Sequence, residues 1–298
     1  MTALQTTRIH ALIAIATVVA LATARVADAA PTKTGYVKTE GLDVYYEVHG
    51  SLASKTTPVL LVHGAFCTIE LCFGSVIPEL AKTRPVIAIE LQGHGHTRDA
   101  NRPFTLTQMT RDTLAVLAKL GVPKADVWGY SMGAGVALEL AITKPRVVNK
   151  LVLMSIVYAK DGLHPGILEG MEHVTADMMK GSPWYAGYVK VAPVNTFDAL
   201  VEKIKKLDDT KSWPEKTIRA LPMPVQIIIG DGDIVRPDHA VKFFQLLGGG
   251  VAADVVGPAK SQLAIIPGAT HVTVAQKIAH LIASVVPFLD EPAADAKK

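Results

Sequence analysis

This sequence has almost no net charge, and its charged residues do not gather by sign. Its 298 residues include 30 Lys and Arg against 27 Asp and Glu, which gives a net charge of +3. The basic residues are scattered, apart from a short cluster at Lys203, Lys205 and Lys206. A nucleic-acid-binding or membrane-surface protein needs a concentrated basic patch, so we predict that the chain binds neither partner.

The sequence also lacks internal repeats, low-complexity segments and the composition of a disordered chain. Hydrophobic residues make up 49% of it and charged residues 19%, which is enough apolar material for a sizeable core. The length suits one large α/β domain or two ordinary domains.

The apolar run at residues 11–24 is shorter than the ~18 residues expected of a membrane-spanning helix. Arg8 precedes it, and Ala27 and Ala29 match the small residues of an export cleavage site. We therefore expect residues 1–29 to be a signal peptide that exports the protein to the periplasm or the cell exterior. No stable membrane insertion is expected after its removal. An uncleaved anchor is the alternative, whereas a lipoprotein anchor would need a nearby cysteine.

Cysteine is nearly absent, since Cys67 and Cys72 are the two thiols of the whole chain. Export would place them in an oxidising compartment, where a disulfide can form. Residues five apart on a helix point to different faces, so a disulfide between them requires a loop. Two separate thiols packed as small apolar groups are the alternative.

Strand and helix signals alternate along the rest of the chain. Apolar runs such as 58–62 and 85–89 are typical of strands buried on both faces. Residues 107–120 have helical spacing, and Gly121 and Pro123 end that helix. The alternation predicts an α/β fold with a mostly parallel, doubly wound sheet. The other predicted strands are 36–40, 44–48, 126–130, 148–154, 224–229 and 263–266, and the other predicted helices are 132–142, 238–247 and 272–289.

Residues 156–216 interrupt this alternation, because they contain no clear buried strand. We expect them to form an inserted helical lid over the carboxyl ends of the strands, where open α/β sheets bind ligands. Residues 30–155 and 217–298 would then form the two parts of the core. A helical excursion packed elsewhere is the alternative. The aromatic and Met side chains of the segment are Tyr158, Met171, Met178, Met179, Trp184, Tyr185, Tyr188 and Trp213.

The segment Gly129-Tyr130-Ser131-Met132-Gly133 matches the pattern G-x-S-x-G between a predicted strand and a predicted helix. In this context the pattern forms a sharp turn that exposes the serine hydroxyl, and the glycines let strand and helix approach closely. The helix N-terminus adds positive potential where negative charge develops. We therefore predict that Ser131 is a catalytic nucleophile, with an ordinary serine in a turn as the alternative.

A neutral hydroxyl is a poor nucleophile until a base removes its proton. His271 follows the last predicted strand at the carboxyl edge of the sheet, from where it can reach Ser131. The base needs an orienting carboxylate, and Asp231 and Asp233 both follow a buried strand. We favour Asp233, which lies deeper in its loop; Asp231 is the alternative and Asp161 a weaker one. The chain order Ser, Asp, His is the one that accompanies this serine turn.

The tetrahedral intermediate of acyl transfer carries an oxyanion that backbone N–H groups must stabilise. The N–H group of Met132 is one predicted donor. The second should come from the turn after strand 58–62, where Ala65 is the best candidate. We expect His63, in the same turn, to make structural hydrogen bonds and not to act as a second base.

Residues 93–99, Gly-His-Gly-His-Thr-Arg-Asp, resemble a metal site, because His-x-His with a nearby Asp is a ligand pattern. The hydrolytic motif His-x-His-x-Asp-His is not met, since Asp99 comes one position late and no histidine follows it. We therefore predict no catalytic metal.

Together these motifs resemble the α/β-hydrolase superfamily over nearly all of the mature chain, about residues 35–289. The resemblance is closest to the lidded, cofactor-free esterase and haloperoxidase-like branch. In the dehalogenase and epoxide-hydrolase branches the nucleophile is Asp, so Ser131 speaks against those chemistries. Glu90, where relatives usually carry Asp, and His96, where a small or charged residue is commoner, depart from the pattern. The matching segments are 63–64, 93–95, 129–133, 230–233 and 268–271.

The resemblance implies a serine hydrolase without a cofactor that cleaves a small-molecule ester, thioester or lactone through an acyl-enzyme. The apolar lid favours an acyl or aryl substrate, and Phe66 and Trp184 are the predicted substrate-binding residues. The alternatives are perhydrolysis or carbon–carbon bond cleavage on the same residues, a ligand-binding protein with little turnover, and the metal hydrolase.

Overall fold

The structure is a computed structural model that describes residues 30–192, 196–207 and 212–292. The predicted signal peptide, residues 1–29, lies outside the described residues, so export stays a prediction. Within the described part of the chain, no helix has both the length and the hydropathy that crossing a membrane requires.

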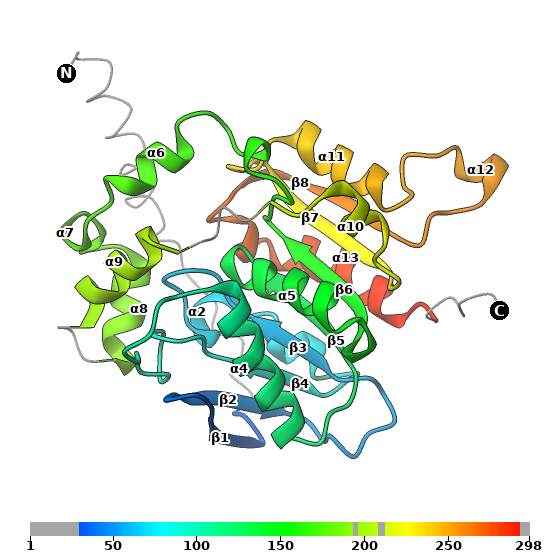
Figure 1. Cartoon of the computed structure of the whole chain (residues 1–298). Helices are drawn as coiled ribbons and strands as arrows, with labels where there is room; N and C mark the ends of the chain where they lie inside the picture. Colours follow the sequence, from blue (N-terminus) through cyan, green and yellow to red (C-terminus); the bar gives the residue numbers. More distant parts are fainter. Residues whose placement is uncertain (1–29, 193–195, 208–211, 293–298) are drawn as a thin grey trace, which may run out of the picture.

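An eight-stranded sheet forms the centre of the molecule (Figure 1), in the order β1-β2-β4-β3-β5-β6-β7-β8. The hairpin β1–β2 is antiparallel, and β2 pairs antiparallel with β4. All other neighbouring strands are parallel, so the predicted mostly parallel sheet is confirmed. The strands are β1 (Lys33–Lys38), β2 (Asp43–His49), β3 (Val59–Val62), β4 (Val86–Ile89), β5 (Ala125–Tyr130), β6 (Val148–Met154), β7 (Val225–Gly232) and β8 (Gln262–Thr270).

Helices cover both faces of the sheet, because the central strands send apolar side chains to each face in turn. In β3, Leu60 and Val62 belong to one hydrophobic core, whereas Val59 and Leu61 belong to the other. The doubly wound α/β architecture is therefore confirmed. The first core is closed by α4 (Leu106–Lys119), α5 (Met132–Thr143) and α11 (Pro237–Leu246), and the second by α2 (Ile69–Phe73), α3 (Ile77–Leu80) and α13 (Ile278–Asp290).

A helical insertion separates β6 from β7, as predicted. Its helices run from residue 167 to residue 219, so they begin later and end later than the predicted segment 156–216. Residues 156–166 hold only one 3₁₀ turn, and the last helix continues past residue 216. The division into core and lid units stays a prediction. The helices are α6 (Ile167–Glu172), α7 (Ala176–Met179), α8 (Pro183–Val191), α9 (Phe197–Lys205) and α10 (Glu215–Arg219).

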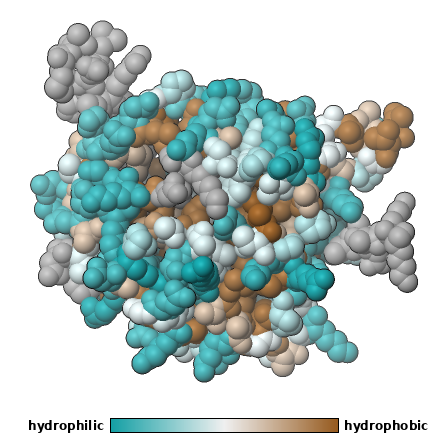
Figure 2. Space-filling model, in the orientation of Figure 1, coloured by the Kyte–Doolittle hydropathy of each residue, from teal (hydrophilic) through white to brown (hydrophobic). Residues whose placement is uncertain are grey.

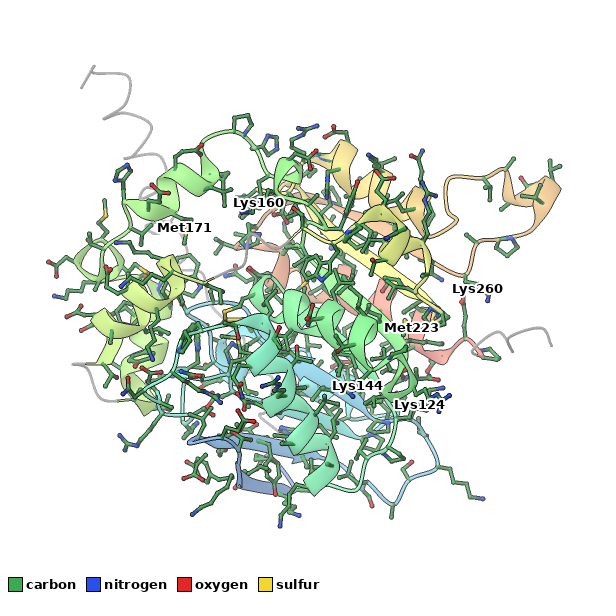
Figure 3. All side chains as sticks on the ribbon, in the orientation of Figure 1. Lys124, Lys144, Lys160, Met171, Met223 and Lys260 are labelled. Atoms are coloured by element: carbon green, nitrogen blue, oxygen red, sulfur yellow. A yellow bond between two sulfur atoms is a disulfide. The ribbon has the colours of Figure 1, made fainter. Side chains whose placement is uncertain are left out.

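The insertion lies at the carboxyl ends of the strands. In Figure 3, Lys160 and Met171 mark the insertion side of the molecule. Lys124 and Met223 lie on the opposite side, one residue before β5 and two residues before β7, so they mark the amino ends of these strands. The insertion therefore occupies the edge at which open parallel sheets bind ligands.

One exposed apolar segment stands apart from both cores. It is α12 (Ala253–Val256), where Val255 is 82% exposed and Val256 is 67% exposed. In Figures 1 and 2 it projects from the side of the molecule away from α6 to α9. It therefore takes no part in the site described below.

The two cysteines form a disulfide, with Cα atoms 6.1 Å apart. Cys67 precedes Thr68, the N-cap of α2, and only Cys72 lies on the helix. The bond thus uses the loop geometry that this sequence spacing requires. It closes the segment that follows the His63-Gly64 turn.

Candidate active site

Ser131 lies between β5 and α5, where the chain turns directly from strand to helix. Its backbone has φ +52° and ψ −120°, a conformation that costs free energy for any residue except glycine. The contacts around the turn leave little choice, because a Cβ atom at Gly133 would approach the carbonyl oxygen of Val62 to 2.1 Å. Such enforced strain is typical of a residue held for function.

The predicted nucleophile, base and acid lie in one hydrogen-bonded line. Ser131 Oγ lies 3.0 Å from His271 Nε2, and His271 Nδ1 lies 2.8 Å from Asp233 Oδ1. With Nδ1–H donated to the carboxylate, Nε2 is free to accept the serine proton. The Asp233 side chain is fully buried, whereas the His271 side chain is 19% exposed. The structure therefore brings these three side chains together.

The Asp233 carboxylate is held in its charged form. Burial alone would raise its pKa, but hydrogen bonds from His271, Ser155 and the Val235 N–H group outweigh burial. The pKa of Asp233 therefore lies below its usual range. A carboxylate that stays ionised can stabilise an imidazolium ion at His271.

The other two candidate acids have different partners. Asp231 is exposed, and its carboxylate accepts the Ala269 N–H group at 3.1 Å. Hydrogen bonds from the Gly268 and Ala269 backbone hold the pKa of Asp231 below its usual range. Asp161 is exposed as well. Asp233 is the acid that contacts His271.

Met132 and the turn that contains Ala65 both adjoin Ser131. Met132 is the first residue of α5, and the first N–H groups of a helix have no partner within it. Ala65 follows Gly64, where a Cβ atom would approach Ser131 Cβ to 3.2 Å. The turn after β3 therefore passes directly against the serine.

Two polar residues of the site were missed by sequence reasoning. Tyr130, inside the serine motif, donates its hydroxyl to the backbone carbonyl of His271 at 2.6 Å. Ser155, with φ +57°, donates to the second oxygen of Asp233. Its position directly after strand 148–154 was the available signal, because that places it at the carboxyl edge of the sheet.

His63 makes structural hydrogen bonds, as predicted. It is fully buried; its Nδ1–H donates to the Gly64 carbonyl at 2.7 Å, and its Nε2 accepts the Leu91 N–H group at 3.0 Å. Burial lowers the pKa of His63 to about 3. The ring is therefore neutral at ordinary pH, and both its nitrogens are engaged.

The Gly-His-Gly loop is organised by hydrogen bonds. His94 donates Nδ1–H to the Gln92 carbonyl at 2.9 Å and accepts the Phe66 N–H group on Nε2 at 3.0 Å, which leaves no nitrogen for a metal. His96 Nδ1 lies 2.9 Å from Glu90 Oε2, and this hydrogen bond raises the pKa of His96. Glu90 and His96, the two residues that depart from the family pattern, thus contact each other. Among the described residues there is no group of three or more His, Cys, Asp or Glu that could hold a metal ion.

We expect the fold to lose stability between pH 7 and pH 5 through His63 and His94. Burial lowers the pKa of these groups to about 3 and about 4, respectively. Unfolded imidazoles have a pKa near ~6.5, so below that pH the unfolded chain binds protons that the folded chain excludes. The free energy of unfolding therefore decreases as the pH is lowered. At pH 5 the loss relative to pH 7 is about 2 kcal/mol for each group.

Denaturant unfolding at pH 7 and pH 5 measures this loss. His63→Gln keeps an acceptor for the Leu91 N–H group, and it should lose about 2 kcal/mol less than the wild type over the same interval. The same loss in both proteins would contradict the assignment.

Aromatic side chains connect the turn after β3 with the insertion. The Phe66 ring lies 6.1 Å from that of Phe197 in α9, which contacts Tyr185 and Tyr188 of α8 at 5.1 and 5.0 Å between centroids. Trp184 precedes Tyr185 on α8 and is partly buried against the same core. The substrate-binding roles of Phe66 and Trp184 stay predictions.

Comparison with known proteins gives consistent matches. Residues 57–181 match a family model described as alpha/beta hydrolase fold. The chain is 36% identical over 120 residues to a 2-hydroxymuconate semialdehyde hydrolase of Pseudomonas sp. (strain CF600), a match that covers 39% of this chain and 41% of that protein. It is 29% identical over 218 residues to a 2-hydroxy-6-oxo-6-(2'-aminophenyl)hexa-2,4-dienoic acid hydrolase of Metapseudomonas resinovorans, with 65% of this chain and 74% of that protein covered.

A solved structure resembles the whole described fold. The enol-lactonase from Burkholderia xenovorans LB400 superposes with a TM-score of 0.66 at 17% identity, over 86% of this chain and 100% of that one. At this identity the likeness shows the fold alone. The matches to three curated relatives, the semialdehyde hydrolase among them, each span less than half of the relative's own length. None of the relatives named here is a haloperoxidase, so that branch stays a prediction.

Proposed function

This chain belongs to the α/β-hydrolase fold superfamily, as its motifs predicted, and from this premise we propose that it is a serine hydrolase that cleaves a neutral carboxylic ester or lactone. The observation that carries the proposal is the hydrogen-bonded line from Ser131 through His271 to Asp233. Such a line activates a hydroxyl for attack on a carbonyl carbon.

In the proposed reaction, His271 Nε2 takes the proton of Ser131 as its oxygen attacks the substrate carbonyl. The N–H groups of Met132 and Ala65 donate to the oxyanion that forms. Asp233 stabilises the imidazolium, which then protonates the departing alkoxide and leaves an acyl-enzyme. A water molecule, deprotonated by His271, attacks the acyl carbon and releases the acid, which restores Ser131.

The surroundings of the site favour an uncharged, apolar acyl group. Phe66, the residue after the proposed oxyanion donor Ala65, has its ring 6.1 Å from that of Phe197 in the insertion, which in turn contacts Tyr185. An anionic substrate would need a cation nearby, and four of the described lysines of the insertion are already paired with carboxylates. These pairs are Lys180–Asp177, Lys190–Glu70, Lys203–Asp99 and Lys205–Glu202.

A second candidate function is hydrolysis of a carbon–carbon bond beside a ketone. The names of two relatives favour it, the 2-hydroxymuconate semialdehyde hydrolase and the hexa-2,4-dienoic acid hydrolase. Its substrate would differ from a neutral ester, because the dienoic acid carries a carboxylate that a binding site must neutralise with a cation.

A series of p-nitrophenyl esters tests the proposal. If the acyl chain enters an apolar site, kcat/KM should rise by about fourfold for each added methylene from acetate to hexanoate, the effect of burying one CH₂ group. A dienoic ring-cleavage acid is the competing substrate in parallel assays. If the protein turned over that acid faster than every ester, the proposal of ester hydrolysis would be wrong and carbon–carbon bond hydrolysis would be the supported function.

Tyr130→Phe should slow the reaction without removing it. The variant loses the hydrogen bond to the His271 carbonyl, which is worth about 1 kcal/mol and corresponds to about a fivefold lower kcat. Tyr45→Phe is the matched control, because its hydroxyl bonds Glu47 in the edge hairpin. Steady-state kinetics should separate the two variants, and equal kcat values for both would contradict a role for Tyr130 in holding His271.

A further inference from the structure

The turn that carries the proposed oxyanion donor is tied to the loop after β4 at three points. Each tie joins a group of the turn or of the following α2 to a group of residues 90–94. Two of them lie on either side of Ala65, so the position of its N–H group is fixed from both sides. The ties are Leu91 N–H to His63 Nε2 at 3.0 Å, Phe66 N–H to His94 Nε2 at 3.0 Å, and Ile69 N–H to Glu90 Oε1 at 3.3 Å.

The tie to His94 decides which N–H group faces the substrate. Ala65 and Phe66 carry consecutive N–H groups in the turn that passes against Ser131 at Gly64, and either could serve as the second oxyanion donor. The Phe66 N–H group is engaged by His94 Nε2, and Phe66 has φ +61°, which a non-glycine residue adopts only when its surroundings hold it there. We propose that His94 is a positioning residue that holds Phe66 in this conformation and thereby assigns the oxyanion to the N–H group of Ala65.

The surroundings of His94 suit it for this role. Its side chain is fully buried and lies between His63 and Phe104, with ring centroids 5.0 and 6.3 Å away. The Nδ1–H bond to the Gln92 carbonyl fixes the tautomer in which Nε2 is an acceptor. Burial lowers the pKa of His94 to about 4, so the ring remains an acceptor at neutral pH. His94 therefore acts through Phe66 and not through contact with substrate.

This inference rests on the proposed serine hydrolysis and makes a kinetic distinction. Oxyanion donors act on the transition state, so their displacement lowers kcat while the KM for the ester stays nearly constant. Complete loss of one donor costs about 100- to 1000-fold in turnover, and displacement of a donor should cost about 10- to 100-fold.

The test compares three substitutions at one position with a control elsewhere. His94→Leu removes the acceptor. The side chain of His94→Asn is too short for its amide oxygen to reach the position of Nε2, whereas the longer side chain of His94→Gln can place an oxygen there. His239→Leu is the control, because His239 is also buried and accepts a backbone N–H group, that of Tyr158, at 3.3 Å. For each variant we would measure thermal stability, kcat and KM on a p-nitrophenyl ester, and the inhibition constant of a trifluoromethyl ketone, which forms an oxyanion on Ser131.

We expect His94→Leu and His94→Asn to lower kcat by about 10- to 100-fold and to weaken the ketone by a similar factor. His94→Gln should recover most of the kcat and most of the affinity for the ketone. His239→Leu should not lose kcat and ketone affinity together. If His94→Leu fails to fold, the same difference between the Asn and Gln variants supports the proposal. Folded Asn and Gln variants with equal kcat, or a loss confined to KM, would overturn it. Wild-type protein that neither turns over esters nor binds the ketone would overturn the proposed function first, and this inference with it.

Discussion

Replacement of Ser131 by alanine will lower ester turnover by on the order of 10⁴- to 10⁶-fold, because it removes the atom that attacks the substrate. The fold should not change, since the turn is imposed by close contacts of Gly133 and not by the serine hydroxyl. The variant should therefore show the thermal stability of the wild type and still bind the ester. A stopped assay with a p-nitrophenyl ester, corrected for spontaneous hydrolysis, measures the effect.

The outcome also separates serine chemistry from the metal alternative. Turnover that survives in Ser131→Ala and disappears with a chelator would require a metal hydrolase, and the serine account would then be wrong. The serine account predicts that turnover disappears in Ser131→Ala and that the turnover of the wild type is unchanged by the chelator. The hydrogen bonds that occupy both ring nitrogens of His94 lead us to expect the second result.

Asp233→Asn should be the second most severe change, with a loss of about 10⁴-fold in kcat. An amide at this position carries no charge to stabilise the imidazolium of His271. Its NH₂ group can also face Nδ1 and favour the wrong histidine tautomer. The loss should appear in kcat while the KM stays similar, because Asp233 is fully buried behind His271 and does not touch the substrate.

Asp231→Asn provides the matched control for this prediction. Asp231 lies two residues away on the same loop, and its carboxylate accepts the Ala269 N–H group. An asparagine oxygen can still accept that hydrogen bond, so kcat should change by no more than about threefold, the effect of weakening one charge-assisted bond. If only Asp231→Asn abolished turnover, the assignment of the acid to Asp233 would be wrong.

The sequence predicted the sheet and the line of three side chains for one physical reason. In a parallel sheet, residues that follow buried strands meet at one edge even when they are far apart in the chain. Ser131, Asp233 and His271 each follow such a strand, so their meeting could be expected without coordinates. The preference for Asp233 over Asp231 rested on its depth in the loop, and the structure gives Asp233 the contact with His271.

Features that depend on side-chain packing were not predictable from spacing. The bond from Tyr130 to the His271 carbonyl joins residues 141 positions apart, and no pattern links them. The tie between His94 and Phe66 likewise depends on how two loops pack. Short helices such as α2 and α3 carry too few turns to give a clear period. The closing helix was predicted from residue 272 but begins at Ile278, because Thr270 and Thr273 exchange hydrogen bonds that close a turn first.

The most direct test of the account is to find the residue that reacts with a fluorophosphonate probe. Such a probe forms a covalent bond with an activated serine, and peptide mass spectrometry locates the adduct. We predict a single adduct on the peptide that contains Ser131, absent from Ser131→Ala and strongly slowed in Asp233→Asn. No adduct on well-folded wild-type protein, or an adduct at another serine that persists in Ser131→Ala, would contradict the central claim that Ser131 is the nucleophile.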